Sequence, residues 1–400
     1  MIISRFTEAL VRFYNRYYVV FWLVFALVVL RASYYSLLAA FESSLDMQWY
    51  PAVQLWTSGG GGSHLDVINP YVAFLEGDRF MANGPNYMPF MYFFMMPFAF
   101  LDWESTKIAF GLLNIILFLA TIFIFYIAGV PRLFLWFISI LVLFGYTYGN
   151  VIGNAQSAII VGFGVVLAYS FRHKPWIMVI GLSLVCVKHS FALPILLGFF
   201  LCGYYKEVFG SALIVFGFVC LFGFKVGASP IEVLHLLSQV NAYAYLSDHA
   251  LGGPSDLMSL SQKLFGTPYS VISFVILLVY VSFVVLVWRF KPKTHRVVAA
   301  SIILSLLTLP HLGYDHYMLF IAICLASLSC KYEKIVLYMV VLALFLWRGE
   351  KIFKPLFERL NPDVSIHWAM NMGVIFCVCV IVLFALVSYG LILNTRKHKC

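Results

Sequence analysis

The sequence predicts an all-α, polytopic membrane protein with about twelve transmembrane helices, and three observations lead to this prediction. Of the 400 residues, 63% are hydrophobic and only 11% are charged, whereas a soluble domain has roughly 25% charged residues. The mean hydropathy is +0.94. Apolar runs close to the length of roughly 20 residues that crosses a bilayer as a helix recur along the chain. We therefore expect a single integral-membrane domain over residues 1–400.

The expected crossings follow from where these apolar runs begin. Each run is bounded by polar or charged residues, and several are shorter than a full span. The runs begin near Tyr18, Ser105, Leu133, Ala155, Trp176, Ser190, Val208, Tyr269, Val297, Tyr314, Ile335 and Trp368.

Two apolar stretches do not fit a simple crossing. The stretch 87–101 is followed at once by acidic residues, Asp102 and Glu104, so we interpret it as a re-entrant or surface-lying segment. The stretch 176–204 has Lys188 and His189 at its centre. A charge in the middle of a bilayer costs about 2.5–3.5 kcal/mol on insertion scales, so we predict two short helices that meet at the outer face. A single broken helix is the alternative, and it would place the loop 228–268 inside.

The distribution of charge predicts the orientation. If the crossings alternate, sixteen of the 26 basic residues but only three of the 17 acidic residues lie on the side of the two termini. By the positive-inside rule both termini are then cytoplasmic. The polar segments 42–86, 148–157, 228–268 and 310–316 all emerge on the opposite, external side. We take residues 42–104 as an external catalytic loop region carrying juxtamembrane or re-entrant helices, and 228–268 as a second external loop.

A carboxylate begins this first external loop. Asp46 follows the first apolar run by a few residues and is flanked by Trp49 and Tyr50. In a partly desolvated site a carboxylate has a raised pKa and accepts a proton from a hydroxyl, so Asp46 is our candidate general base. A helix cap or a solvated loop carboxylate is the alternative interpretation.

Further polar residues are expected at the same face. Asn154 and Gln156 offer amides that suit sugar hydroxyls, although Asn154 could instead cap a helix. Lys188 must find an anion or water, and for the anion a lipid phosphate and a neighbouring carboxylate are the alternatives. His311, Asp315 and His316 lie within six residues; a histidine there could bind a phosphate or assist proton transfer. A metal site is a further alternative, but no ligand pattern indicates one, so we predict neither metal nor cofactor.

These motifs occur in an order that resembles a known family. An aspartate after the first helix is followed by Asn-Pro-Tyr at 69–71, Tyr-Met-Pro at 87–89, Gly-Asn-Ala-Gln at 153–156, Lys188 and the segment 310–317. This order is similar to that of integral-membrane glycosyltransferases of the GT-C superfamily, above all the polyprenol-phosphate-mannose-dependent mannosyltransferases of family 87. The sequence departs from them in having Asn-Pro-Tyr without the usual Gly-x-x-Pro-Tyr spacing.

The resemblance implies an inverting transfer of a sugar, with a mannose-like hexose favoured, from a polyprenyl-phosphate donor to a glycolipid or polysaccharide acceptor. It implies roles for the candidate residues. Asp46 and His316 would be catalytic; Lys188, His189 and His311 would bind the donor phosphate; Tyr50, Tyr71, Tyr87, Asn154, Gln156 and Asp315 would bind the sugar or the acceptor. The expected location is a bacterial inner membrane, with the active site on its periplasmic or external side and no nucleic-acid partner.

Two other classes of protein remain as alternatives. A transporter or lipid-linked-sugar flippase would also have many helices and an intramembrane lysine, but inverted repeats, which are common in transporters, are not evident. A non-catalytic component of polysaccharide assembly would use the same loop for binding alone.

Overall fold

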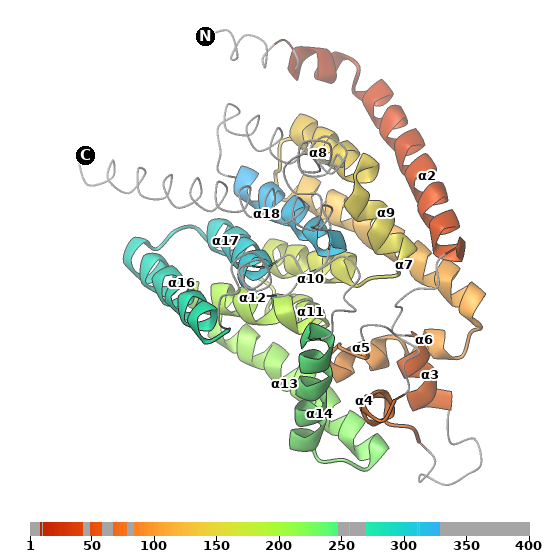
Figure 1. The fold of residues 1–400 in the computed structure, drawn as a ribbon. Helices are drawn as coiled ribbons and strands as arrows, with labels where there is room; N and C mark the ends of the chain where they lie inside the picture. The colour runs from red at the N-terminus through yellow and green to blue at the C-terminus, as the bar shows by residue number, and fades with distance from the viewer. Residues whose placement is uncertain are drawn as a thin grey trace, which may run out of the picture.

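The computed structural model describes residues 9, 11–42, 49–57, 67–77, 84–246, 256, 269–309, 311 and 313–328, and these form helices without any strand (Figure 1). The fold is therefore all-α over the described residues, as predicted. The elements are α2 (Tyr18–Glu42), α3 (Trp49–Thr57), α4 (Pro70–Leu75), α5 (Pro89–Phe94), α6 (Met96–Ala99), α7 (Trp103–Ile127), α8 (Arg132–Phe144), α9 (Tyr146–Gly153), α10 (Ala158–Ser170), α11 (Pro175–Val185), α12 (His189–Leu201), α13 (Tyr205–Val226), α14 (Pro230–Leu246), α16 (Tyr269–Phe290), α17 (Thr294–Thr308), the 3₁₀ turn η2 (Gly313–His316) and α18 (Tyr317–Ser327).

Four of the described helices, α2, α7, α13 and α16, are long and apolar enough to cross a membrane, and the bent pair α8 and α9 makes a fifth if it counts as one span. Their outward faces carry large apolar side chains in contact with the surroundings, for example Leu27 on α2 and Trp288 on α16. Such surfaces are stable where lipid replaces water. Helices α2 and α16 lie at opposite edges of the molecule (Figure 1).

The predicted count of about twelve crossings is not confirmed. Helices do start within a few residues of the expected positions, but α10, α11, α12, α17 and α18 have only 11 to 15 residues each. At 1.5 Å per residue such helices reach about 16–23 Å, less than the roughly 30 Å of a hydrocarbon core. The last two expected crossings, near Ile335 and Trp368, lie outside the described residues.

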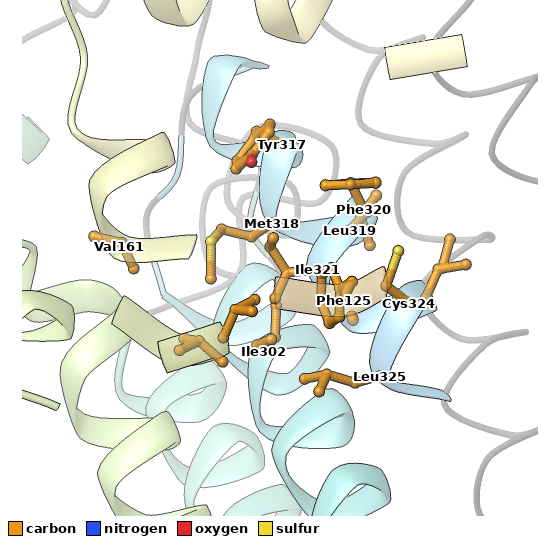
Figure 2. Close-up of a cluster of buried hydrophobic side chains, with 14 of the residues drawn as sticks. Phe125, Val161, Ile302, Tyr317, Met318, Leu319, Phe320, Ile321, Cys324 and Leu325 are labelled. Atoms are coloured by element: carbon orange, nitrogen blue, oxygen red, sulfur yellow. The ribbon is translucent and has the colours of Figure 1, made fainter. Parts of the chain in front are cut away.

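The centre of the molecule is formed by α17 and α18, in which every residue except Thr294 is buried. A helix that is apolar on all sides is stable only inside a larger structure. Tyr317, Phe320 and Ile321 of α18 pack against Phe125 of α7 and neighbouring helices (Figure 2). This core fixes the position of the polar residues that precede α18.

Helices α10 and α11 form a tight antiparallel hairpin. A Cβ atom added at Gly164 would lie 2.6 Å from the carbonyl oxygen of Gly181, and one added at Gly181 would lie 2.7 Å from the backbone nitrogen of Ala168. Only glycine allows two helix backbones to approach this closely. The hairpin brings the residues before α10 and those after α11 to the same end.

The segment expected to be re-entrant or surface-lying contains two short helices, α5 and α6, of six and four residues. Neither is long enough to cross a bilayer. Asp102 then caps α7, because its side chain accepts a hydrogen bond from the Ser105 backbone N–H at 2.8 Å. The indole N–H of Trp49 on α3 donates to the Phe98 carbonyl at 3.0 Å, which attaches α3 to this segment.

The loop expected at 228–268 contains a helix that the prediction omitted. In α14 the apolar residues Val233, Leu237 and Val240 are buried and belong to a cluster with Tyr71 of α4 and Phe222 of α13. Their i, i+4, i+7 spacing is that of one helix face, so this periodicity could have indicated the helix.

Candidate functional site: a polar network at four helix breaks

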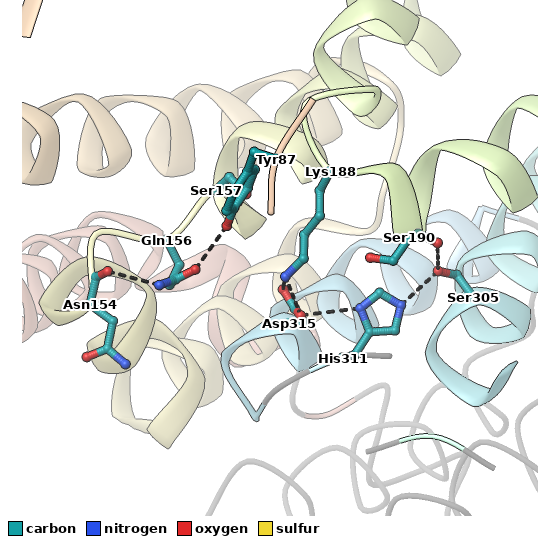
Figure 3. A network of polar contacts seen from close by, with 9 residues as sticks. All are labelled: Tyr87, Asn154, Gln156, Ser157, Lys188, Ser190, Ser305, His311 and Asp315. Atoms are coloured by element: carbon teal, nitrogen blue, oxygen red, sulfur yellow. Dashed lines mark hydrogen bonds and ion pairs between the residues drawn. The ribbon is translucent and has the colours of Figure 1, made fainter. Parts of the chain in front are cut away.

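Several of the polar residues predicted as site residues meet where four helical segments begin or end, among them Tyr87, Gln156, Lys188, His311 and Asp315 (Figure 3). Tyr87 precedes α5, residues 154–157 join α9 to α10, residues 186–188 join α11 to α12, and His311 and Asp315 follow α17. Non-helical backbone at membrane depth is tolerated where it is enclosed by protein or lines a polar cavity. Interrupted helices therefore create the place in which polar groups can be held.

Lys188 and Asp315 form a nearly buried ion pair at the centre of this network. The Nζ atom of Lys188 donates to the two carboxylate oxygens of Asp315, at 2.7 and 2.6 Å. The Lys188 side chain is 14% exposed and that of Asp315 is fully buried. The ammonium also lies 5.1 Å from the ring centre of Tyr314 and 6.0 Å from that of Tyr87, within the range of cation–π attraction. Of the two partners that the sequence left open, the structure shows the carboxylate.

His311 extends the pair into a chain of hydrogen bonds. Its Nδ1 lies 3.3 Å from Asp315 Oδ2 and its Nε2 lies 3.0 Å from the Ser305 hydroxyl, which is also 2.7 Å from the Ser190 carbonyl oxygen. A carboxylate can only accept, so we assign a proton to Nδ1. The single proton of the Ser305 hydroxyl can then be donated to only one of its two acceptors at a time, His311 Nε2 or the Ser190 carbonyl oxygen.

Burial lowers the pKa of His311 below its ordinary value, and the negative charges of Asp315 and Asp256 oppose this effect. The imidazole is fully enclosed, and desolvation disfavours its charged form. His311 is therefore neutral near pH 7, the form in which an imidazole can accept a proton from Ser305.

A second network holds Gln156 and Ser157 beside this pair. The Tyr87 hydroxyl donates to Gln156 Oε1 at 3.0 Å and accepts from Ser157 Oγ at 3.1 Å, while Gln156 Nε2 donates to the Asn154 carbonyl at 3.2 Å. Ala155 adopts a positive φ of 49°, a conformation that costs a non-glycine residue of order 1–3 kcal/mol. Such strain is concentrated at functional sites. Here the strained residue lies in the turn between Asn154 and Gln156, the two residues with amide side chains.

The comparison with protein families agrees with this geometry. The model of Glycosyltransferase family 87 matches residues 86–310, which is more than half of the chain. The chain belongs to this family. The glycosyltransferase resemblance noted in the sequence is thereby confirmed, and no curated protein and no solved structure matches the chain.

The family 87 match includes three of the four breaks that build the site. Tyr87, the 154–157 turn and Lys188 lie inside the matched residues, as does Ser305, whereas His311 and Asp315 follow immediately after them. The polar network of this family 87 chain thus lies almost entirely within the region that defines its membership. Asp46 precedes the match and lies outside the described residues.

The remaining predicted site residues have different positions. His189 and His316 are close in sequence to the pair, and the Nδ1 atom of His189 is buried with no hydrogen-bond partner in the described part of the chain. His316 is buried at the start of α18. Tyr71 is fully buried, and its hydroxyl donates to the Tyr87 carbonyl at 2.8 Å. Asn154 is the C-cap of α9, not a helix N-cap, and contributes its carbonyl to the network.

Besides Ser157 of the 154–157 turn, three partners in this site were not predicted from the sequence. Ser190, Ser305 and Asp256 are all buried. The two serines lie in apolar helices, where a hydroxyl usually bonds to its own helix, so their composition alone gave no signal. Asp256 influences His311 electrostatically, and nothing in its sequence neighbourhood distinguishes it from other loop carboxylates. Among the described residues, no group of three His, Cys, Asp or Glu side chains could hold a metal ion.

Proposed function

We propose that this family 87 glycosyltransferase transfers a hexose, with mannose favoured, from a polyprenyl-phosphate donor to a glycolipid or polysaccharide acceptor, with inversion at the anomeric carbon. The observation that carries the proposal is the position of the Lys188 ammonium, held by Asp315 beside Tyr87 and the 154–157 turn. It supplies a cation next to neutral hydrogen-bonding groups, as a sugar phosphate requires.

The leaving phosphate is assigned to Lys188. An ammonium has three N–H donors, and Asp315 accepts from two of them. The third can donate to a phosphate oxygen as the glycosidic C–O bond breaks and its electrons pass to that oxygen. A preorganised donor aimed at developing negative charge is among the largest contributions to catalysis.

We assign Asp315 a different role from the one that the sequence suggested. Both of its oxygens bind Lys188, and one also contacts His311. We assign Asp315 to orienting the ammonium in place of binding sugar. His311 contacts the Asp315 carboxylate, and Ser305 contacts His311.

The sugar hydroxyls are assigned to the second network. The amide of Gln156, the amide side chain of Asn154 and the hydroxyls of Tyr87 and Ser157 offer donors and acceptors together, the combination that sugar hydroxyls need. Because these side chains are neutral, they do not attract the phosphate away from the Lys188 ammonium.

Activation of the acceptor is assigned to Asp46. The acceptor hydroxyl loses its proton to this carboxylate as its oxygen attacks the anomeric carbon on the face opposite the leaving phosphate. The products are an inverted glycoside and a polyprenyl phosphate. We place this reaction at the external face of a bacterial inner membrane with both termini in the cytoplasm, as the charge asymmetry favours.

Incubation of the purified protein with polyprenyl-phosphate hexoses and extracted membrane glycolipids tests the proposal. We expect an acceptor mass increment of one hexose together with release of polyprenyl phosphate, and greater activity with mannose than with glucose or galactose donors. If the protein instead moves a lipid-linked sugar across sealed liposomes and forms no glycosidic bond, the flippase interpretation replaces this one.

A further inference from the structure

A cavity of about 490 Å³ opens between the beginning of α2, the end of α7 and the start of α8. The side chains of Tyr18 and Phe123, which line it, are themselves more than half exposed. The cavity is therefore accessible from the side, along the surface that faces lipid. A molecule within the bilayer could enter it without passing through water.

The lining of the cavity changes from polar to apolar along the helix axes. Arg132, at the first position of α8, and Asn15, before α2, lie at one end. Phe25, two turns into α2, and Leu119, two turns before the end of α7, lie at the other. Such a gradient matches a membrane lipid, which has a polar head and an apolar chain.

The polar end is electropositive and holds a buried hydroxyl. The guanidinium of Arg132 stacks 4.9 Å from the ring centre of Tyr126, and no acidic side chain is among the described residues that line the cavity. The side chain of Tyr14 is buried at this end, next to Trp22 and within the electrostatic reach of Arg132. Its hydroxyl and the guanidinium of Arg132 are two hydrogen-bonding groups that an oxygen of a bound head group can contact.

The cavity lies on the membrane face opposite the catalytic network. Gly153, at the end of α9 beside that network, packs against Ala39 near the end of α2, whereas the cavity is lined by Tyr18 at the beginning of α2. The 21 residues between these positions span roughly 31 Å of helix, about the thickness of the hydrocarbon core. A ligand in the cavity therefore belongs to the other leaflet and cannot be the donor bound at Lys188.

We propose that this cavity binds one anionic phospholipid of that leaflet, with its phosphate on Arg132 and its chains along Phe25 and Leu119. Charge complementarity decides the occupant. A guanidinium binds a phosphate group through two parallel hydrogen bonds. An anionic phospholipid also carries a net negative charge that attracts Arg132, whereas a zwitterionic phospholipid has no net charge. The bound lipid would hold the start of α2 against α7.

Quenching of Trp22, which lines the cavity, tests this proposal. The full-length protein is placed in phosphatidylcholine nanodiscs that contain a small fraction of a lipid with brominated chains, either phosphatidylglycerol or phosphatidylcholine. Subtracting the signal of a Trp22→Phe variant isolates Trp22 from the other eight tryptophans. We expect half-maximal quenching at roughly tenfold less brominated phosphatidylglycerol than phosphatidylcholine, the effect of one charged hydrogen bond.

Two variants separate this site from general attraction to basic residues. Arg132→Gln should remove the tenfold preference, whereas Arg16→Gln should keep it, since Arg16 is exposed on the same side but does not line the cavity. Leu119→Phe, which narrows the apolar end, should reduce quenching by both lipids.

If Arg132→Gln does not fold, native mass spectrometry of the unaltered protein replaces it. We then expect the protein to retain phosphatidylglycerol in preference to phosphatidylcholine. Equal quenching by the two lipids, or loss of preference in Arg16→Gln, would overturn the proposal.

Discussion

The ammonium of Lys188 lies 2.7 and 2.6 Å from the two carboxylate oxygens of Asp315, although 127 residues separate them in the chain. The contact joins the break between α11 and α12 to the turn that precedes α18. It holds the cation in one orientation while leaving a third N–H for a substrate oxygen.

Lys188→Gln should lower kcat by about 10²–10³-fold, because a neutral amide stabilises the developing phosphate charge less well. The measurement is the initial rate of hexose transfer at saturating donor. Lys206→Gln is the matched control, since Lys206 is an exposed lysine at the start of α13, and it should transfer at the unaltered rate. A Lys188→Gln enzyme within threefold of the unaltered enzyme would remove Lys188 from the mechanism.

Asp315→Asn should lower the free energy of unfolding by about 3–5 kcal/mol, because it leaves Lys188 as a charge without its carboxylate. The double variant Lys188→Met with Asp315→Leu should regain much of that loss, since apolar replacement of a buried pair is often neutral, and yet remain inactive. Thermal unfolding in detergent and transfer assays measure the two effects. A double variant as unstable as the single one would show that the pair contributes to folding through more than its charges.

Tyr87→Phe should reduce kcat/KM for the donor on the order of tenfold, because Gln156 and Ser157 lose the hydroxyl that orients them, and a lost buried hydrogen bond costs about 1–3 kcal/mol. Tyr71→Phe is the comparison, since it removes a hydroxyl that donates to the Tyr87 carbonyl oxygen and also hydrogen-bonds the Tyr92 side chain. We expect Tyr71→Phe to lower the melting temperature with little change in KM. A large KM change in Tyr71→Phe would restore the sugar-binding role that the sequence suggested.

His311 should make stability depend on pH. Burial holds its pKa below 6.5, so the unfolded chain binds a proton more readily than the folded one. The stability that neutral His311 contributes is fully present above pH 6.5 and is lost as the pH falls toward the folded-state pKa. The melting temperature of the unaltered protein should therefore fall between pH 7.5 and 5.5 by more than that of His311→Gln. His235→Gln, an exposed histidine on α14, should behave like the unaltered protein, and identical profiles for all three would contradict the assignment.

Asp46→Asn should abolish transfer while leaving folding close to normal, because it removes a proton acceptor with little change of shape. Loss of a general base costs about 10²–10⁴-fold. Transfer rates and the melting temperature are measured on the same preparation. Activity within about threefold of the unaltered enzyme would exclude Asp46 as the base.

The starts of the helices could be read from the sequence, whereas their lengths could not. Runs expected near Tyr18, Tyr269 and Ser190 begin as helices at Tyr18, Tyr269 and His189, because a boundary between polar and apolar residues is a local signal. Whether an apolar run crosses the membrane or stops part-way depends on the neighbours that satisfy its backbone, which are distant in sequence. The two short helices on either side of Lys188 were predicted because a charged residue marks that break locally.

Some members of the candidate site could be predicted from the sequence, because a polar residue beside an apolar run is also a local signal. Lys188, Gln156 and Tyr87 stand out as polar or Tyr-Pro elements next to apolar runs. Their partners could not be assigned, because the pairing of Lys188 with Asp315 and of Ser305 with His311 depends on how four helix ends meet. Tyr71, which we predicted to bind the sugar or the acceptor, is fully buried and packs against Tyr92 and Phe222.

The close contact between Gly164 and Gly181 affects the distance between two parts of the candidate site. Gln156 lies before α10 and Lys188 after α11, so the closeness of the two helix backbones sets how far apart the amide and the ammonium are held. An alanine at either glycine would push against backbone atoms, which cannot rotate away as a side chain can. Under the proposed function, such an enzyme would keep every reactive group and still hold the sugar-binding amide and the phosphate-binding ammonium at the wrong distance from each other. We therefore expect two residues without a side chain to set the distance between these two binding groups.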